Sequence, residues 1–187
     1  MKRRVFLSGA AGVAAMAAGG WMAWRVSSRK GPGGSAPAQG QQGAAQADAG
    51  QFMQLALPDV AGRQVPLSSF AGQPMLVNFW ATWCPPCVKE MPDLEALQKK
   101  FPQVRFVGIG IDTAENIRAF TEKVQVSYPL LVAGHQGIDI VRSLGNSAGG
   151  LPFTVVFDAD GRVNRRILGQ VKPDDLARTL SAYAGRG

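Results

Sequence analysis

The chain has two cysteines, Cys84 and Cys87, separated by two prolines. They follow an apolar, β-forming run that ends at Ala81, and a helix-forming segment begins with them. Pro85 fits the first helical turn, where its missing N–H costs nothing. Cys84 would then lie at the helix N-terminus, where unpaired N–H groups and the dipole favour a thiolate. Because of this position, Cys84 is the expected nucleophile. Cys87, one turn later on the same face, is close enough to form a disulfide with it.

Other uses of a cysteine pair fit the sequence less well. A disulfide that closes so short a loop removes only about 2 kcal/mol of unfolded-state entropy, against about 3 kcal/mol for a loop of about fifteen residues. A c-type haem site requires His directly after Cys87, where the chain has Val88. A structural zinc site needs four ligands, and the chain has two cysteines and one histidine, His135, in a loop. We therefore expect redox chemistry, with no metal and no cofactor besides the Cys84–Cys87 pair.

The segment around the cysteines resembles the active-site segment of the thioredoxin superfamily. The resemblance rests on residues 78–87, Asn-Phe-Trp-Ala-Thr-Trp-Cys-Pro-Pro-Cys, and on Pro92 five residues further on. Residues 87–92 resemble more narrowly the membrane-tethered TlpA/ResA/DsbE branch, and the match covers residues 52–183. It implies an α/β, thioredoxin-like fold, in which helices flank a central mixed sheet. That branch adds a central strand–helix insertion to the minimal fold, and the sequence also predicts a hairpin ahead of the main sheet.

The same resemblance suggests a proton acceptor for Cys87. Thioredoxin has a buried Asp six residues before its first cysteine, where this chain has Asn78, which cannot titrate. The TlpA/ResA branch has an acid three residues after the second cysteine, and here that residue is Glu90. Partly apolar surroundings would raise the pKa of Glu90 toward the range in which it exchanges a proton with a thiol. Spacing alone is equally consistent with a solvent-facing Glu in the first turns of a helix.

A second stretch, residues 149–157, resembles the strand that faces the disulfide in thioredoxin-like proteins. There a cis-proline precedes the strand, and Leu151-Pro152 matches its surroundings. This geometry would expose the backbone N–H and C=O of Leu151 beside Cys84, where an extended substrate segment could pair with them. The resemblance thus implies catalytic roles for Cys84, Cys87 and Glu90, and substrate-binding roles for Trp83, Pro85, Leu151 and Pro152.

Apolar periodicity and turn residues predict the elements that position these residues. Strands are expected at residues 52–57 and 64–67, as a hairpin, and at 75–80, 104–111, 128–132, 154–157 and 162–168. Helices are expected at residues 85–100, 114–124, 138–144 and 173–183. The strand at 75–80 is almost continuously apolar, which indicates burial on both faces. Asp112 is expected to cap the helix that follows it.

Composition divides the chain into three parts. Residues 1–30 have six positive charges and no acid, and they enclose an uncharged run, 5–24, long enough to span a bilayer as a helix. We expect an export segment that stays as an anchor, with a cleaved signal as the alternative. Residues 31–51, dominated by Gly, Pro, Ala, Gln and Ser, are expected to be a disordered linker before the domain at 52–187. Beyond residue 30 there are 14 basic and 13 acidic groups, so the net charge of +7 does not indicate nucleic-acid binding.

The resemblance implies a thiol-disulfide oxidoreductase that acts mainly as a reductase of disulfide-bearing proteins in the periplasm. Apocytochrome c or a copper-site assembly protein would be its substrate, a membrane electron donor would recycle it, and the domain would be monomeric. One alternative is a Sco-like copper chaperone that uses Cys84, Cys87 and His135, although Sco proteins place three residues between their cysteines. Another is a thiol peroxidase, which requires Thr or Ser where this chain has Ala81.

Overall fold

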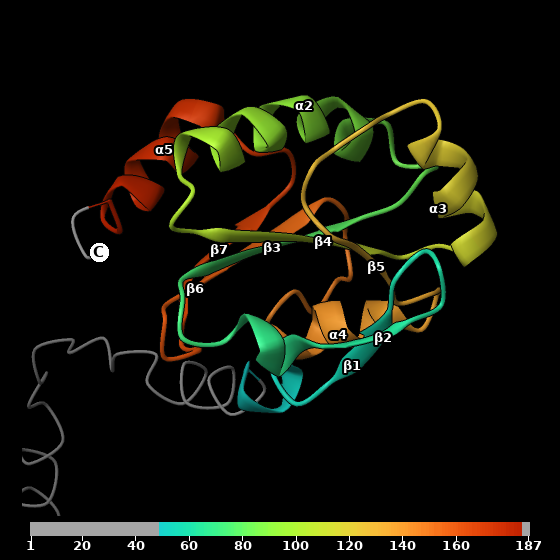
Figure 1. The fold of residues 1–187 in the computed structure, drawn as a ribbon, viewed down its shortest axis with the longest axis horizontal. Helices are drawn as coiled ribbons and strands as arrows, with labels where there is room; N and C mark the ends of the chain where they lie inside the picture. The colour runs from blue at the N-terminus through green and yellow to red at the C-terminus, as the bar shows by residue number, and fades with distance from the viewer. Residues whose placement is uncertain (1–48, 185–187) are drawn as a thin grey trace, which may run out of the picture. The chain divides into compact units, whose positions relative to one another are not determined.

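The fold is seen in a computed structural model that describes residues 49–184 (Figure 1). The predicted export segment, 1–30, and residues 31–48 of the predicted linker lie outside these residues. Within the described part, no helix is both long enough and apolar enough to cross a membrane.

The described part of the chain begins inside the predicted linker, 31–51, three residues before the predicted start of the domain at residue 52. Residues 49–52 are helical, and the side chains of Ala49 and Phe52 are 1% and 2% exposed. Phe52 stacks on the ring of Phe157, with 5.4 Å between the ring centroids. The packed part of the chain therefore includes residues before Phe52. A short segment rich in Gly and Ala has no periodicity from which this packing could be predicted.

A hairpin precedes the main sheet, as expected. Strands β1 (Ala56–Pro58) and β2 (Gln64–Pro66) pair antiparallel, and the 3₁₀ helix η1 (Leu67–Phe70) follows. The first strand is shorter than the predicted 52–57, because Phe52 belongs to the preceding helical turn. In the connection, Asp59 Oδ1 accepts hydrogen bonds from the N–H groups of Ala61 and Arg63.

The main sheet has five strands in the order β5-β4-β3-β6-β7. The central strand β3 pairs parallel with β4 and antiparallel with β6, so the sheet is mixed, and all six residues of β3 are buried as predicted. The edge strand β5 and the helix α4 (Gly137–Ser143) form the strand–helix insertion between β4 and β6. The bounds are β3 (Met75–Trp80), β4 (Arg105–Gly110), β5 (Leu130–Val132), β6 (Phe153–Phe157) and β7 (Val163–Leu168).

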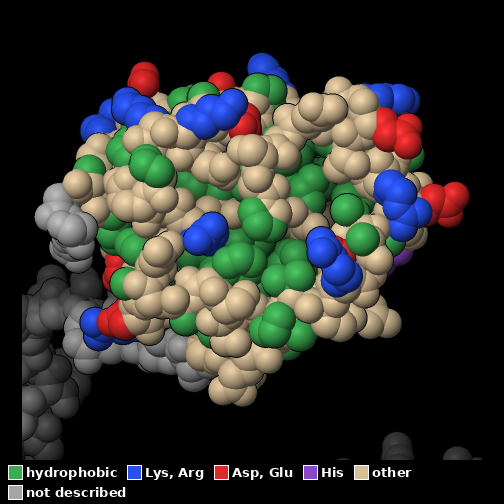
Figure 2. All heavy atoms as spheres, in the orientation of Figure 1, with side chains coloured by type: hydrophobic (Ala, Val, Ile, Leu, Met, Phe, Trp, Pro, Cys, Tyr) green, Lys and Arg blue, Asp and Glu red, His purple; other side chains and the backbone are tan. Residues whose placement is uncertain are grey.

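Helices cover both faces of the sheet (Figure 1). On one face lie α2 (Pro85–Lys100) and α5 (Pro173–Ser181), over a core that contains Leu76 and Leu94. On the other lie α4 (Gly137–Ser143), η1 and the hairpin, over a core that contains Val77 and Phe79. Alternate residues of β3 thus enter different cores, because successive strand side chains point to opposite faces. Figure 2 shows hydrophobic side chains gathered midway between these two layers, with Lys and Arg scattered around them.

The element after β4 begins differently from the prediction. Helix α3 (Ala114–Thr121) has Thr113, not Asp112, as its N-cap, and Thr113 Oγ1 accepts a hydrogen bond from the N–H of Asn116. The helix is also shorter than the predicted 114–124. Both Asp and Thr are good N-cap residues, so the sequence could not choose between two adjacent candidates.

Candidate active site

The two cysteines lie at the N-terminus of α2, just beyond the C-terminal end of β3. Cys84 is the N-cap residue of α2 and Pro85 is its first residue. Cys84 and Cys87 form a disulfide with 5.3 Å between their Cα atoms, and the side chains are 5% and 0% exposed. No side chain caps this N-terminus, and its first turn contains no acidic residue. Backbone N–H groups and the helix dipole can therefore stabilise a Cys84 thiolate when the disulfide is reduced.

The loop that leads to Cys84 is fixed by Asp112, which is 0% exposed. The Thr82 hydroxyl donates to Asp112 Oδ2, while Oδ1 accepts from the Thr113 N–H at 2.8 Å and from Asn116 Nδ2 at 2.7 Å. Burial raises the pKa of Asp112, but these donors outweigh burial and hold the pKa below its usual value. Asp112 thus connects the active-site loop to the start of α3, a role that the sequence analysis missed.

Leu151 and Pro152 directly precede strand β6, and the peptide bond between them has the configuration expected from the resemblance. The Leu151–Pro152 peptide bond is cis, and the Leu151 side chain packs against the hydrophobic cluster that contains Cys84 and Cys87. The Pro152 carbonyl accepts a hydrogen bond from the Gly169 N–H at 2.8 Å. The backbone N–H and C=O of Leu151 make no hydrogen bond to any described residue. They are therefore able to pair with another extended segment.

Asn146 forms hydrogen bonds with the two glycines that precede Leu151. Its side-chain Nδ2 donates to the Gly150 carbonyl at 2.8 Å, and its own carbonyl accepts from the Gly149 N–H at 2.9 Å. Gly149 has a φ of +67°, a conformation that glycine adopts without the steric cost of a Cβ. The sequence analysis did not identify Asn146, because a single Asn in a Gly-rich loop carries no distinctive pattern.

Two large hydrophobic side chains are exposed in the described part of the chain, and both lie near this site. Trp83, next to Cys84, is 61% exposed, and Leu168, at the end of β7, is 63% exposed. Leu168 lies across from Gly150, since a Cβ added at Gly150 would be 3.5 Å from Leu168 Cδ1. Trp83 and the exposed Pro85 were expected at the site. Leu168 was not, because nothing in its sequence context separates it from the other apolar residues of a strand.

Glu90 is completely buried, and it lies on the same helical face as Cys87. Its Oε1 accepts a hydrogen bond from Asn78 Nδ2, and its Oε2 accepts one from the Val171 backbone N–H, each at 2.8 Å. Asn78 Nδ2 also donates to Thr154 Oγ1 at 3.0 Å. The solvent-facing alternative for Glu90 is therefore excluded. Glu90 instead links α2 to β3 and to the loop before α5, and Asn78 connects it further to Thr154 in β6.

Burial raises the pKa of Glu90, and Asp93 on the same helix raises it further. The hydrogen bonds from Val171 and Asn78 act in the opposite direction, since they favour the carboxylate, but the net shift is upward. A carboxyl group with a raised pKa, one helical turn from a thiol, is suited to take up the proton of that thiol. Asn78, Thr154 and Val171 were not identified as site residues from the sequence.

His135 lies in the exposed loop before α4. Across residues 49–184, no three His, Cys, Asp or Glu side chains gather closely enough to hold a metal ion. The cysteine pair and His135 are thus not gathered into such a group in this disulfide-bonded structure.

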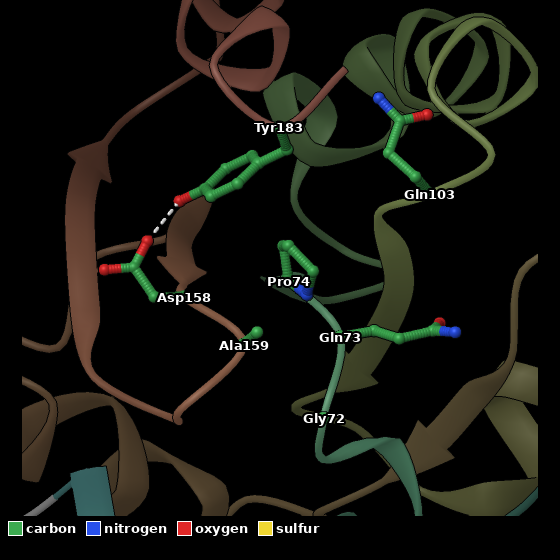
Figure 3. Close-up of a pocket in the computed structure, with 7 residues that line it drawn as sticks. All are labelled: Gly72, Gln73, Pro74, Gln103, Asp158, Ala159 and Tyr183. Carbon is green, nitrogen blue, oxygen red and sulfur yellow. Dashed lines mark hydrogen bonds between the residues drawn. The ribbon is translucent and has the colours of Figure 1, made fainter. Parts of the chain in front are cut away.

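The hollow in Figure 3 lies at the opposite end of β3 from the cysteines. It has a volume of about 280 Å³, and its residues Gly72, Gln73 and Pro74 directly precede β3, whereas Cys84 follows that strand. Across it, the Tyr183 hydroxyl donates to Asp158 Oδ1 at 2.6 Å. Neither cysteine lines the hollow, so it is separate from the disulfide.

Thiol-disulfide exchange is the chemistry that this arrangement can perform. The reducible bond lies at a helix N-terminus, a buried acid follows one helical turn later, and a backbone segment without hydrogen bonds belongs to a residue that packs against the same hydrophobic cluster. With the mixed sheet and its flanking helices, the site defines a thiol-disulfide oxidoreductase of thioredoxin-like fold.

The chain belongs to the Redoxin family, whose profile matches residues 35–183. Its relatives include the thiol-disulfide oxidoreductase ResA of Bacillus thuringiensis subsp. konkukian, which is 31% identical over 125 residues. That match covers 65% of this chain and 70% of ResA. ResA of Geobacillus thermodenitrificans is 29% identical over 130 residues, which are 67% of this chain and 72% of that protein.

Solved structures agree with the fold. A thioredoxin-related protein from Neisseria meningitidis serogroup B superimposes with a TM-score of 0.61 at 34% identity, covering 68% of this chain and 98% of that one. DsbF of Mycobacterium tuberculosis, solved in mixed oxidized and reduced forms, superimposes with a TM-score of 0.62 at 26% identity. That match covers 71% of this chain and 96% of DsbF. The thioredoxin-like fold and the TlpA/ResA/DsbE-like class expected from the sequence are confirmed.

Proposed function

We propose that this oxidoreductase works mainly in the reducing direction, on disulfide-bearing proteins outside the cytoplasm. The Cys84 thiolate attacks one sulfur of a substrate disulfide, which forms a mixed disulfide and releases the other substrate sulfur as a thiolate. Cys87 gives its proton to Glu90, and its thiolate attacks Cys84 Sγ. The second substrate sulfur leaves, so two electrons pass to the substrate and the Cys84–Cys87 disulfide forms.

The burial of Glu90 is the observation that carries this mechanism. Cys87 is 0% exposed, so bulk water cannot take its proton directly, and Glu90 is the acid on the same helical face. The unpaired backbone of Leu151 supports binding of the substrate as an extended segment beside Cys84. Trp83 and Pro85, the exposed residues directly before and after Cys84 in the sequence, would contact the same segment.

The reducing direction is supported by the residues between the cysteines. Strongly oxidising members of the superfamily have His there, which stabilises the thiolate, whereas this chain has Pro85-Pro86. An enzyme that reduces disulfides in an oxidising compartment must itself be reduced again. We therefore propose a membrane electron donor as one partner and apocytochrome c or a copper-site assembly protein as the other, with the domain acting as a monomer.

We also propose that residues 5–24 anchor the protein in the inner membrane, with the domain in the periplasm. The support is the uncharged run between two positively charged ends in the sequence. Carbonate extraction of membranes from cells that express the full chain tests this anchor. Retention in the membrane pellet is expected, and release of the intact chain would contradict the anchor without affecting the mechanism.

Trapping of partners in cells tests the proposed function. In Cys87→Ala, the mixed disulfide on Cys84 cannot be resolved, so partners should accumulate as covalent adducts that a reductant releases. Cys84→Ala is the matched control, because it keeps one thiol but lacks the nucleophile. If Cys84→Ala accumulated the same adducts, or if Cys87→Ala accumulated none, the assigned roles of the two cysteines would be wrong.

A further inference from the structure

In the side-chain amide of Asn78, the nitrogen forms hydrogen bonds and the oxygen forms none with the described residues. Its Nδ2 donates to Glu90 Oε1 at 2.8 Å and to Thr154 Oγ1 at 3.0 Å. Its Oδ1 is buried and has no hydrogen-bond partner among the described residues. The residue is 1% exposed, and an unpaired carbonyl oxygen at such a position is costly. A purely structural link between β3 and α2 would not require this cost.

The two ends of an amide have nearly the same shape but opposite chemistry. An ionised carboxylate only accepts hydrogen bonds, whereas a protonated carboxyl group also donates one. The present orientation of Asn78 therefore suits ionised Glu90. After a half-turn of the amide, Oδ1 would face Glu90 and Thr154 and could accept from a carboxyl O–H and from the Thr154 hydroxyl. Since Nδ2 would then take the unpaired position, each orientation leaves one end unpaired, and the charge of Glu90 decides between them.

We infer that Asn78 is a positioning residue for the proton transfer, and that its amide inverts when Glu90 changes between carboxylate and acid. In the reduced enzyme the amide donates to the carboxylate that awaits the Cys87 proton. Once that proton has arrived, the inverted amide accepts from the acid, so Glu90 keeps a partner in both states. This inference rests on the proposed role of Glu90 as the proton acceptor.

The surroundings of Glu90 contain few other groups that could drive such a change. On α2 the titratable neighbours are Cys87 itself and Asp93, which interacts with Glu90 through its charge. From the segment before β5, the buried Tyr128 also interacts electrostatically with Glu90, and burial raises the pKa of Tyr128 far above neutral pH. The contacts from β6 and from the loop before α5 come from Thr154 and the Val171 N–H, which do not titrate.

Nuclear magnetic resonance of the reduced, ¹⁵N- and ¹³C-labelled protein tests the inversion directly. The Glu90 carboxyl carbon reports its protonation, and contacts between the Asn78 Nδ2 protons and Thr154 report the amide orientation. We expect these contacts to weaken as the pH falls, with the same midpoint as the Glu90 carbon. Contacts that persist unchanged through that midpoint would overturn the inference. This holds even if the chemical shifts of the Asn78 side-chain amide respond to the change in the charge of Glu90. The Glu90→Gln protein is the control, in which no midpoint should remain.

A kinetic measurement separates this inference from the proposed function. Thionitrobenzoate placed on Cys84 as a mixed disulfide is released when Cys87 attacks, so its release measures resolution alone. In Asn78→Leu the carboxylate loses a charge-assisted donor, so release at neutral pH should slow about tenfold and its pH midpoint should rise. An unchanged midpoint in a folded Asn78→Leu protein would contradict the role of Asn78. An unchanged rate of release in Glu90→Gln would instead contradict the proposed function. The magnetic resonance titration of the wild-type protein tests the inversion without relying on any variant.

Discussion

At the scale of single residues, the site depends on which groups are charged and buried. Cys84 is the end residue of a helix with no competing cap, and Glu90 is a buried acid with two hydrogen-bond donors. Both could be selected from the sequence, because the cysteine spacing and the resemblance marked them. The backbone donor to Glu90 could not be selected from the sequence. The Val171 N–H comes from a residue 81 positions away, and backbone donors have no sequence signature.

The buried Glu90 should make the stability of the oxidised protein depend on pH. Its pKa is raised in the folded state from an ordinary value of 4.5, so the folded state holds this proton more tightly than the unfolded chain does. Its contribution to the free energy of unfolding is full below pH 4.5 and is lost as the pH rises through the raised pKa. In Glu90→Gln this loss should be absent.

Urea unfolding of the oxidised wild-type and Glu90→Gln proteins between about pH 4 and pH 8 measures the difference. Acids with lowered pKa values, such as Asp112 and Glu95, change stability in the opposite direction, but they contribute equally to both proteins. We expect the free energy of unfolding of the wild type to fall relative to that of Glu90→Gln as the pH rises. A difference in this free energy that is constant over the range would contradict a raised pKa for Glu90. So would a difference in which Glu90→Gln becomes relatively more stable as the pH falls.

At the scale of elements, β3 and α2 were predicted with the bounds that the structure shows. A buried strand with a continuous apolar run and a helix that begins at a proline have strong local signals. The short elements were less accurate, because tertiary contacts set their ends. The helical turn at residues 49–52 exists through the packing of Ala49 and Phe52 on the core, and α4 depends on a close approach at Gly137.

Gly137 allows α4 to lie against the sheet. A Cβ atom added there would be 2.5 Å from Ala133 Cβ and 2.6 Å from Ile111 Cδ1, and the Ala133 Cβ cannot move by side-chain rotation. Gly137→Ala should therefore displace α4 and lower the free energy of unfolding by about 1–3 kcal/mol. Chemical denaturation measures this change.

Gly50→Ala is the matched control, because nothing lies within 4 Å of a Cβ at this exposed helical position. It should leave stability unchanged or raise it by up to about 1 kcal/mol. Equal effects of the two substitutions would show that the contacts of Gly137 do not restrict α4.

At the scale of the whole molecule, we expect the fold not to depend on the disulfide. The hydrophobic core continues on both faces of the sheet, whereas the Cys84–Cys87 bond joins residues only three apart. The order of the five strands could be predicted only through the resemblance, because local patterns do not determine which strands are neighbours. The resemblance also supplied the cis bond before Pro152, which is uncommon for prolines in general.

Reduction should therefore lower the free energy of unfolding by no more than about 2 kcal/mol, the entropy that so short a loop removes from the unfolded chain. Any stabilisation of the Cys84 thiolate in the folded state would make the loss smaller. Denaturation of the oxidised and reduced forms, with and without a strong reductant, measures it. Unfolding of the domain on reduction would show that the bond is a structural one.

The central claim is that Cys84 is ionised and accessible near neutral pH while Cys87 is neither. Alkylation of the reduced protein with iodoacetamide, followed over time and located by mass spectrometry at several pH values, tests it most directly. We predict that Cys84 is labelled first and faster than free cysteine at pH 7, with a midpoint below the usual thiol pKa of about 8.5. Labelling of Cys87 first, or of neither sulfur faster than free cysteine, would contradict the claim.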